Sequence, residues 1–221
     1  MFELFRSFTG LFLNPEPPNR FLKVACEFLW NFNGRSLIYP MSMKSNMKPP
    51  FNNSYWLIPD QIVCGEYPRD VDDLEDHEGM TALLGAGVRT FVDLTEPDEL
   101  KPYRQIAINT AEKLGINPDD LEFNKHPIRD VSVPRSPAEM TAVLETIQTA
   151  VENDSIVYLH CWGGRGRTGT VAGCLLTELH QVSGTEALVE LKELWKECAK
   201  SSYAESPETE EQREFVRDWN R

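Results

Sequence analysis

The feature that most limits the fold of this chain is an apolar segment followed directly by a glycine-rich loop and a second, longer apolar segment. Residues 156–159 (Ile-Val-Tyr-Leu) are apolar and begin with two β-branched side chains, which is typical of a strand buried inside a sheet. Gly163, Gly164 and Gly166 follow within the next seven residues. Residues 168–180 are then rich in apolar side chains over the length of a helix. The order strand, loop, helix predicts one unit of a parallel sheet.

The chain from Tyr55 onward alternates short apolar runs with amphipathic segments in the same way. Strands are expected at residues 56–58, 62–64, 90–94 and 122–128, and further helices at 81–86, 103–114 and 137–151, after 183 and after 206. Ser136 and Glu139 have the spacing of a capping box, with Pro137 at the first helical position. This alternation predicts an α/β fold in which a central, mainly parallel and twisted sheet is flanked by helices.

Composition divides the chain into two parts. The 221 residues have a net charge of −13, but residues 1–50 alone carry a net +3 and residues 51–221 a net −16. Seven of the eleven phenylalanines lie within the first 32 residues, and residues 40–54 are rich in Met, Asn, Ser and Pro. We therefore predict an N-terminal aromatic-rich extension and linker over residues 1–54 and one domain over residues 55–221.

The extension has two interpretations. Phe21, Ala25, Phe28 and Leu29 have the spacing of one face of a helix. Such a face can pack on the main domain. It can also contact a partner or a membrane surface, because the face is aromatic and its flanks are mildly basic. Both interpretations fit this spacing.

Charge and cysteine content limit the partners and the location. A net charge of −13 argues against nucleic acid as the main partner, because phosphate backbones attract Lys and Arg. The sequence has no run of about eighteen apolar residues, so no transmembrane segment is expected. Glu3 and Arg6 interrupt the first apolar run, which argues against a secretory signal. Five cysteines, an odd number, argue against a disulfide scaffold. We therefore expect a cytoplasmic protein.

The loop of residues 160–169 (His-Cys-Trp-Gly-Gly-Arg-Gly-Arg-Thr-Gly) has the groups needed to bind a phosphate and to attack it. Backbone N–H groups of a glycine-rich loop at a helix N-terminus can turn inward and form an anion site, aided by the helix dipole. Arg167 enters the first helical turn and can donate two parallel hydrogen bonds to phosphate oxygens. The same positive environment favours the thiolate form of Cys161 at neutral pH. A nucleophile and a site for its substrate therefore lie in one loop.

This segment resembles the signature of the cysteine-dependent protein tyrosine phosphatase superfamily: His-Cys, five residues, Arg, Thr or Ser, and Gly. The likeness extends over about residues 55–221 and is nearest in pattern to the compact dual-specificity phosphatases. It implies a phosphatase-like fold and hydrolysis of phosphomonoesters through a cysteinyl-phosphate intermediate, with Cys161 as the nucleophile and Arg167 as the phosphate ligand. The resemblance implies no metal ion or cofactor, because Arg167 and the loop amides supply the positive charge.

The family also uses an acid that protonates the leaving oxygen, an aspartate on a loop about thirty residues before the cysteine. Asp130 lies 31 residues before Cys161, in the segment Pro-Ile-Arg-Asp-Val-Ser-Val-Pro (127–134), between an expected strand and an expected helix. Asp119 and Asp120 are the competing candidates, but they follow an Asn-Pro pair, where turn formation explains them. We predict that Asp130 is the general acid.

The resemblance assigns roles to further residues. Thr168 corresponds to the hydroxyl that hydrogen-bonds the cysteine sulfur, and His160 to the residue that orients the cysteine. Gln212 stands where some relatives have a glutamine that positions water, although Thr209 and Gln212 also have the spacing of a capping box. The other substrate-binding residues are expected in the loop itself: Trp162, Gly163, Gly164, Arg165 and Gly166.

The sequence leaves several hypotheses for what the phosphate site binds. Proteins phosphorylated on tyrosine, or on serine and threonine, are the first. Arg165 adds a second positive charge to the loop, as in phosphatases of inositol lipids, so a phosphoinositide or another non-protein phosphate is the alternative. Against the lipid stand Trp162, which replaces a basic residue next to the cysteine, and the repulsion between an acidic domain and anionic bilayers. A catalytically silent phosphate-binding module is the third hypothesis, although nucleophile, arginine and acid are all present.

Overall fold

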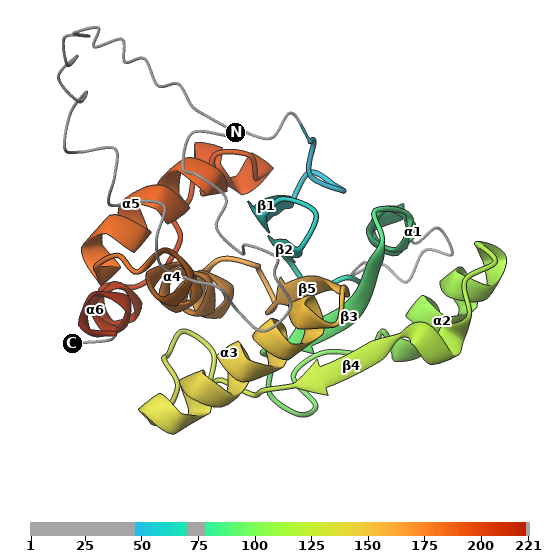
Figure 1. Ribbon diagram of the computed structural model, residues 1–221, viewed down its shortest axis with the longest axis horizontal. Coiled ribbons are helices and arrows are strands. Elements are labelled where there is room, and N and C mark those ends of the chain that lie inside the picture. Colours follow the sequence, from blue (N-terminus) through green and yellow to red (C-terminus); the bar gives the residue numbers. More distant parts are fainter. Residues whose placement is uncertain (1–46, 70–77, 220–221) are drawn as a thin grey trace, which may run out of the picture. The chain divides into compact units, whose positions relative to one another are not determined.

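The computed structural model describes residues 47–69 and 78–219, and these residues form a five-stranded sheet with helices on both faces (Figure 1). Residues 1–46, most of the predicted extension, lie outside the described residues, as do residues 70–77 of an acidic run. The two interpretations of the extension therefore stay predictions. Among the residues that the structure describes, no helix is long and apolar enough to cross a membrane.

The strands are β1 (Ser54–Ile58), β2 (Ile62–Gly65), β3 (Val88–Asp93), β4 (Glu122–Lys125) and β5 (Ile156–His160). Their spatial order is β1-β2-β5-β3-β4. The last four of these are parallel to one another, and β1 pairs antiparallel with β2 at one edge. The prediction of an α/β fold with a mainly parallel sheet is confirmed, and the strand predicted at residues 156–159 is the central one.

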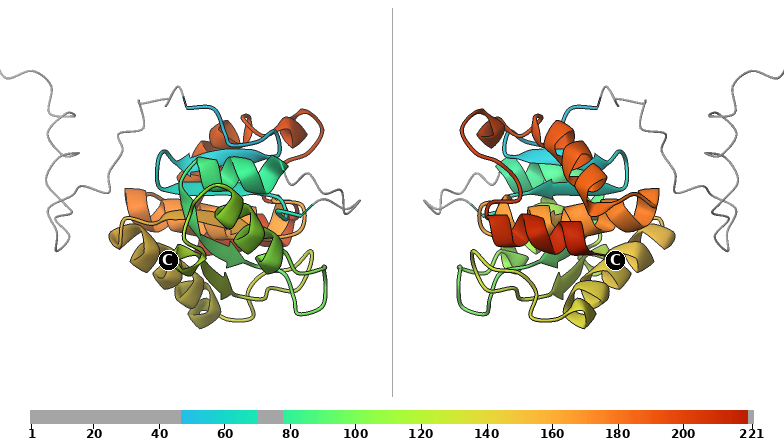
Figure 2. Two further views of the ribbon diagram at one scale, coloured as in Figure 1. Left: turned by 90° about the vertical axis from the view of Figure 1, so that its right-hand side faces the viewer. Right: turned by 90° about the vertical axis from the view of Figure 1, so that its left-hand side faces the viewer.

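The α-helices of the described residues are α1 (Glu78–Gly85), α2 (Arg104–Lys113), α3 (Pro137–Glu152), α4 (Gly166–His180), α5 (Gly184–Trp195) and α6 (Glu210–Asp218). Helices α1 and α2 pack on one face of the sheet, and α3 to α6 pack on the other (Figures 1 and 2). Two 3₁₀ helices, η1 (Pro118–Asp120) and η2 (Ala199–Ser202), lie in the connections. Each helix predicted between residues 81 and 218 is present close to its expected position.

Strand β5 explains why the sheet is covered on both faces. Val157 and Leu159 pack in the core formed with α3 to α6, whereas Tyr158 packs in the core formed with α1 and α2. All three side chains are fully buried, because successive residues of a strand point to opposite faces. A strand that is apolar on both faces lies inside a sheet. The loop that follows β5 is therefore placed at the middle of one sheet edge.

The helix starts follow the predicted capping signals with one difference. At α6, Thr209 and Gln212 form both halves of a capping box. At α3, the Ser136 side chain accepts a hydrogen bond from Glu139 N as predicted. The Glu139 carboxylate, however, accepts hydrogen bonds from the backbone N–H and the guanidinium of Arg135. The predicted capping box of α3 is therefore only half formed, because Arg135 offers Glu139 a charged partner.

Candidate active site

The phosphate loop, residues 161–165, connects the carboxyl end of β5 to the N-terminus of α4. Gly164 has a φ of +70°, and a β-carbon there would collide with the backbone of Gly65 at the end of β2. Only glycine allows this close approach without strain. Tyr67 N, just after β2, donates a hydrogen bond to Trp162 O at 2.8 Å. The end of strand β2 and the residues directly after it therefore hold the loop in place.

Cys161 begins this loop, and Thr168 lies just beyond its end. Cys161 is 3% exposed and follows β5 directly. Thr168 lies in the first turn of α4 and is fully buried. Within the described residues, the Thr168 Oγ1 makes no hydrogen bond. Because buried hydroxyl groups normally have a partner, this oxygen is available for an interaction that forms during a reaction.

Arg167 is 2% exposed and is held by acceptors from two segments, the connections that follow β3 and β4. Its Nη1 and Nη2 donate to the two carboxylate oxygens of Glu99 at 2.8 and 2.7 Å. Nη1 also donates to Ile128 O at 3.1 Å, and Nη2 lies 2.8 Å from Asp130 Oδ1. The hydrogen bonds from Arg167 lower the pKa of Glu99. The guanidinium group is therefore fixed in one orientation by an ionised carboxylate.

Asp130 is the aspartate that the fold brings to this arginine. It lies in the loop between β4 and α3, and its side chain is 49% exposed. The next residue, Val131, has a φ of +57°, which is unfavourable for a β-branched side chain. Asp119 and Asp120 belong to η1, which precedes β4, so they lie near the opposite end of that strand. The geometry favours Asp130 over both competitors.

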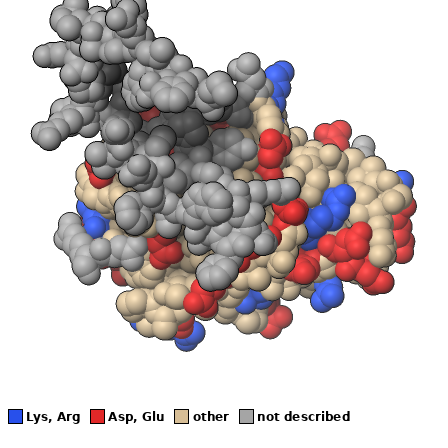
Figure 3. All heavy atoms as spheres, viewed as in Figure 1, with Lys and Arg blue, Asp and Glu red and all other residues tan. Residues whose placement is uncertain are grey.

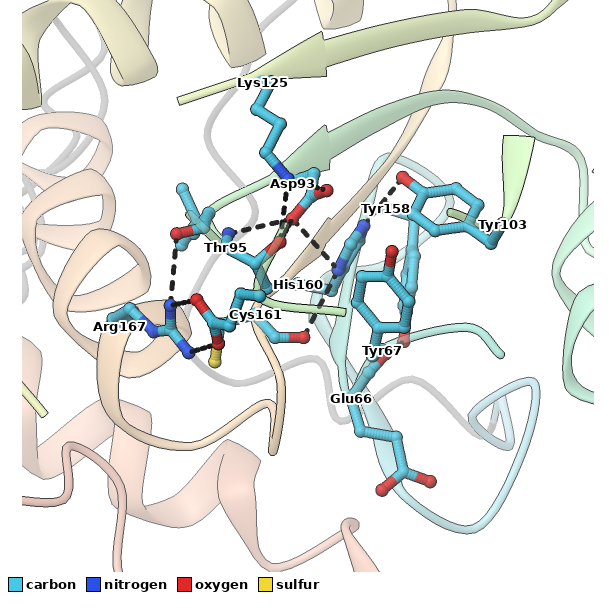
Figure 4. Close-up of polar contacts among 12 residues, drawn as sticks. Glu66, Tyr67, Asp93, Thr95, Tyr103, Lys125, Tyr158, His160, Cys161 and Arg167 are labelled. Carbon is cyan, nitrogen blue, oxygen red and sulfur yellow. Dashed lines mark hydrogen bonds and ion pairs between the residues drawn. The ribbon is translucent and has the colours of Figure 1, made fainter. Parts of the chain in front are cut away.

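His160 lies directly behind the nucleophile and is fully buried. Its Nε2 is 2.9 Å from the Tyr103 hydroxyl and its Nδ1 is 3.3 Å from Cys161 O (Figure 4). Burial lowers the pKa of His160 to about 4 and raises that of Tyr103 well above its ordinary value. We therefore assign a neutral imidazole in which Nε2 accepts from Tyr103 and Nδ1–H donates to Cys161 O. This pair of hydrogen bonds orients the backbone that holds the sulfur.

An ion pair between the buried carboxylate of Asp93 and the exposed side chain of Lys125 lies next to the imidazole. Asp93 Oδ1 is 3.9 Å from His160 Nδ1, and Asp93 Oδ2 accepts a hydrogen bond from Lys125 Nζ at 3.0 Å (Figure 4). Thr95 donates to Asp93 Oδ1 through both its N–H and its hydroxyl. Burial opposes the ionisation of Asp93, but His160, Thr95 and Lys125 lower its pKa overall. The negative charge favours the His160 tautomer that has its proton on Nδ1.

A cavity of about 360 Å³ opens at Cys161. The phosphate loop forms its floor, and the loop after β4 and the segment between η2 and α6 form two walls. Three large apolar side chains at its rim are exposed: Val131 by 52%, Trp162 by 54% and Tyr203 by 76%. They come from three separate segments of the chain. The cavity therefore has a polar floor and an apolar rim.

Most of the predicted site residues line this cavity, namely Cys161, Arg167, Asp130, Trp162, Gly163, Arg165 and Gly166. Gln212 is fully buried beside it. Its Oε1 accepts hydrogen bonds from Glu208 N and Thr209 N, and its Nε2 donates to Ser132 O at 3.0 Å. The amide thus joins the start of α6 to the loop that contains Asp130, and the predicted capping box accounts for its Oε1.

Glu99, Tyr103 and Asp93 are the residues of this site that sequence analysis missed. All three lie in or after β3, which is the parallel neighbour of β5. Side chains that follow neighbouring parallel strands meet at the same sheet edge. The acidic residues directly after the strand predicted at 90–94 could have indicated a role in the site. Using this signal requires knowing that this strand lies beside β5, and the sequence does not give the order of the strands.

The comparisons with known proteins agree with this geometry. Residues 51–216 match the family model of the Swiss Army Knife protein DSP-PTPase phosphatase domain, PTP-SAK. The match covers more than half of the chain. The chain therefore belongs to this family of cysteine-dependent, dual-specificity-type phosphatase domains, as the resemblance of residues 160–169 implied.

The chain is similar to protein 067L of Invertebrate iridescent virus 3, with 29% identity over 146 residues that make up 64% of this chain and 52% of the viral protein. Human cyclin-dependent kinase inhibitor 3 is 36% identical over 114 residues, 51% of each protein. Among solved structures, Tk-PTP in its active form aligns with a TM-score of 0.56 at 24% identity over 76% of this chain and 95% of that chain. The chain spans about half the length of the curated relatives that it matches. The structural likeness supports the phosphatase-like fold.

Proposed function

We propose that this chain hydrolyses phosphomonoesters through a cysteinyl-phosphate intermediate and that its substrates are proteins phosphorylated on tyrosine, with dual specificity. One observation supports this proposal above the others. Cys161, Arg167 and Asp130 lie around a single cavity of about 360 Å³. A nucleophile, a bidentate cation and a carboxyl group in one cavity are the parts that phosphoryl transfer without a metal ion needs.

The first step transfers the phosphoryl group to the enzyme. The Cys161 thiolate attacks phosphorus, and the bond between phosphorus and the leaving oxygen breaks. Arg167 and backbone N–H groups of the loop hold the other phosphate oxygens, where negative charge develops. Asp130 gives its proton to the leaving oxygen. The products are the free alcohol or phenol and a phosphorylated Cys161.

The second step returns the enzyme to its starting state. Asp130, now a carboxylate, takes a proton from a water molecule whose oxygen attacks phosphorus. The bond between sulfur and phosphorus breaks, and inorganic phosphate leaves with the Cys161 thiolate restored. The buried Thr168 hydroxyl, which has no partner within the described residues, is suited to donate a hydrogen bond to the departing sulfur. His160 supports the same sulfur through the Cys161 backbone.

Asp130 changes its partner during this cycle. In the structure its Oδ1 lies 2.8 Å from Arg167 Nη2, on a guanidinium whose other contacts are Glu99 and backbone oxygens. A bound phosphate competes with Asp130 for Nη2 and frees the carboxyl group to face the leaving oxygen. Glu99 keeps its two hydrogen bonds and holds the guanidinium still. The positioning of Arg167 is therefore separate from the proton transfer by Asp130.

The rim of the cavity favours an aromatic phosphate ester. Trp162 and Tyr203 are both more than half exposed. Most other aromatic side chains of the described residues are buried in one of the two cores. Flat apolar groups at the mouth can stack on a phenyl ring, which adds about 0.5–1.5 kcal/mol beyond the burial of area. A seryl or threonyl phosphate offers no such ring. We therefore place phosphotyrosine first among the substrates.

The charges of the cavity weigh against a phosphoinositide. Each cationic side chain that lines it is paired: Arg167 with Glu99 and Asp130, Arg165 with Glu208 at 3.2 Å, and Lys200 with Glu66 at 2.7 Å. Arg167 is the proposed phosphate ligand, and the charges of Arg165 and Lys200 are already balanced by carboxylates. The cavity therefore has no unpaired positive charge for a second phosphate. Carboxylates are also spread over the described surface of the face in Figure 3, which disfavours an anionic bilayer.

Location and domain organisation also belong to this proposal. The four cysteines of the described residues are free thiols, which fits a reducing, cytoplasmic compartment. We propose residues 55–221 as the catalytic domain and residues 1–54 as an extension that contacts the domain, a partner or a membrane surface. Phosphorylated proteins are the partners that this activity requires.

An assay of four substrate types tests the proposal. We expect turnover of a small aryl phosphate and of phosphotyrosine peptides, lower turnover of phosphoserine peptides, and little of phosphoinositides. Tyr203→Ala should reduce the preference for phosphotyrosine over phosphoserine several-fold, whereas Val189→Ala, which truncates a side chain 64% exposed on α5, should not. Phosphate binding without turnover of any substrate would establish a silent binding module, and preferred turnover of phosphoinositides would overturn the protein substrate.

A further inference from the structure

The catalytic cavity is the first of three cavities that share lining residues. A second cavity of about 380 Å³, the middle cavity, is lined by Tyr67, Leu100 and Trp162 together with the charged residues Glu66, Arg69, Glu99 and Lys101. A third cavity of about 290 Å³, the distal cavity, is lined by Tyr67, Leu100, Tyr103, Phe123 and Lys125 among others. Trp162 belongs to both the catalytic and the middle cavities, and Tyr67 and Leu100 belong to both the middle and the distal ones. The three form one interrupted groove.

The groove follows the carboxyl edge of the parallel strands. Tyr67 comes just after β2, Trp162 after β5 and Leu100 after β3, while Phe123 lies in β4 at the far side. This order matches the order of these strands in the sheet. The carboxyl edge of a parallel sheet is where open α/β folds bind their ligands. The groove is therefore a continuation of the catalytic site and not a separate surface.

The middle cavity is built to take an apolar group. Its apolar surface consists of the aromatic rings of Tyr67 and Trp162 and the aliphatic side chain of Leu100, and its charged lining residues are Glu66, Arg69, Glu99 and Lys101. The Arg69 guanidinium donates a hydrogen bond to Pro102 O at 2.6 Å. Its two carboxylates already have cationic partners, because Glu99 binds Arg167 and Glu66 binds Lys200. The Tyr67 hydroxyl donates to Lys101 O at 3.0 Å, so its polar atom is also engaged. An apolar side chain would bury these walls without breaking an ion pair.

We propose that the middle cavity binds a bulky apolar side chain next to the phosphotyrosine of a protein substrate, and that the polypeptide continues toward the distal cavity. The inference rests on the proposed function, since the phosphotyrosine occupies the catalytic cavity. Trp162 lies between the phosphotyrosine and the apolar side chain of the substrate. In the free protein this side chain is 54% exposed and lines both cavities.

This binding energy comes from a part of the substrate that does not react. A side chain the size of leucine that is half buried in the middle cavity should raise kcat/KM about tenfold over the same peptide with a polar neighbour. Free phosphotyrosine and small aryl phosphates lack that group and gain nothing. Peptide length and sequence, and not the phosphate ester alone, therefore set the rate at low substrate concentration.

Phosphotyrosine peptides with one leucine scanned through the neighbouring positions test the inference, with asparagine at the same positions as the reference. We expect one or two positions on one side of the phosphotyrosine to give about a tenfold higher kcat/KM. In Leu100→Asn this advantage should fall to less than about threefold, while turnover of a small aryl phosphate stays within about twofold. Leu114→Asn is the matched control, because Leu114 is 43% exposed at the end of α2 and lines none of the three cavities.

The outcomes separate the inference from the proposed function. If leucine gives no advantage at any position, or if the advantage survives in Leu100→Asn, the middle cavity is not a subsite. If Leu114→Asn lowers the advantage as much as Leu100→Asn does, the effect is not local and the inference is also wrong. If no phosphotyrosine peptide is hydrolysed while another phosphate ester is, the proposed protein substrate fails, and the inference fails with it for that separate reason.

Discussion

The floor and the rim of the catalytic cavity differ in burial and in chemistry. On the floor, Cys161 and Arg167 are 3% and 2% exposed, and the guanidinium of Arg167 is hydrogen-bonded on several sides. At the rim, Trp162 and Tyr203 are 54% and 76% exposed. Buried groups with fixed hydrogen bonds keep the one geometry that a reaction needs. Exposed side chains can change at little cost to the fold, so we assign the chemistry to the floor and the choice of substrate to the rim.

The largest effect is expected for Cys161→Ser. The sulfur is the proposed nucleophile, so turnover should fall by more than about a thousandfold. Binding of a phosphate analogue should persist, because the loop amides and Arg167 form the anion site. Activity assays measure the turnover, and a binding titration with inorganic phosphate measures the affinity of the anion site. Retained turnover, or loss of phosphate binding with loss of turnover, would remove the distinction between nucleophile and anion site.

Asp130→Asn should come second and should depend on the leaving group. Esters with poor leaving groups, such as alkyl and tyrosyl phosphates, need protonation and should slow by about 10²- to 10⁴-fold. Esters with very good leaving groups should lose far less in their first step. Presteady-state rates for a series of aryl phosphates measure this slope. Equal losses across the series would mean that Asp130 is not the acid, and Asp119 and Asp120 would be tested next.

Glu99→Gln tests a residue that holds the Arg167 guanidinium but does not touch the reacting atoms. The variant loses the ionic part of the two hydrogen bonds to Arg167, and kcat/KM should fall by about 10- to 100-fold. A purely structural role would lower the stability without changing the affinity of the folded protein for inorganic phosphate, whereas a positioning role lowers that affinity too. Glu96→Gln, an exposed change three residues earlier, is the control. Similar losses in both variants would contradict the assignment of Glu99.

The last expected effect is on stability and not on activity, and it comes from His160, which lies behind the nucleophile. Burial lowers the pKa of His160 from an ordinary value near 6.5 to about 4. Between these values the unfolded chain binds a proton that the folded protein does not, so stability rises with pH in this window. The contribution, about 3 kcal/mol, is complete above about pH 6.5 and is lost as the pH falls toward 4.

Urea unfolding at pH 7 and pH 4.5 checks this dependence. His126 has a pKa that burial also lowers, so the wild type is compared with His160→Gln, which keeps His126. The wild type should lose more stability than the variant over this interval. An identical loss in both proteins would show that His160 is not buried in its neutral form.

The sequence allowed a good prediction of the floor because its signals are local. Residues 156–169 contain the strand, the loop and the start of the helix in one stretch, so Cys161 and Arg167 could be placed from spacing alone. Asp130 could be placed because the family resemblance implies an acid about thirty residues before the cysteine, and because a strand is expected before it. In both cases the prediction needs only the order of neighbouring elements along the chain and not their arrangement in space.

The rest of the site depends on how distant segments come together. Glu99 binds Arg167 across 68 residues, and Tyr103 binds His160 across 57. Both contacts follow from the position of β3 beside β5, and periodicity predicts strands but not their order. Tyr203 reaches the rim from the segment after η2, whose path depends on tertiary packing. These residues could therefore not be predicted from local patterns.

A rapid-quench experiment tests the central claim most directly. The enzyme is mixed with an aryl phosphate, stopped with acid within the first turnover, digested and analysed by mass spectrometry, with Asp130→Asn included because its hydrolysis step should be slowed. The account predicts one phosphoryl group on the peptide that contains Cys161, formed as the phenol is released and lost as inorganic phosphate appears. Phenol release with no phosphorylated Cys161, or with the phosphoryl group on another residue, would contradict it.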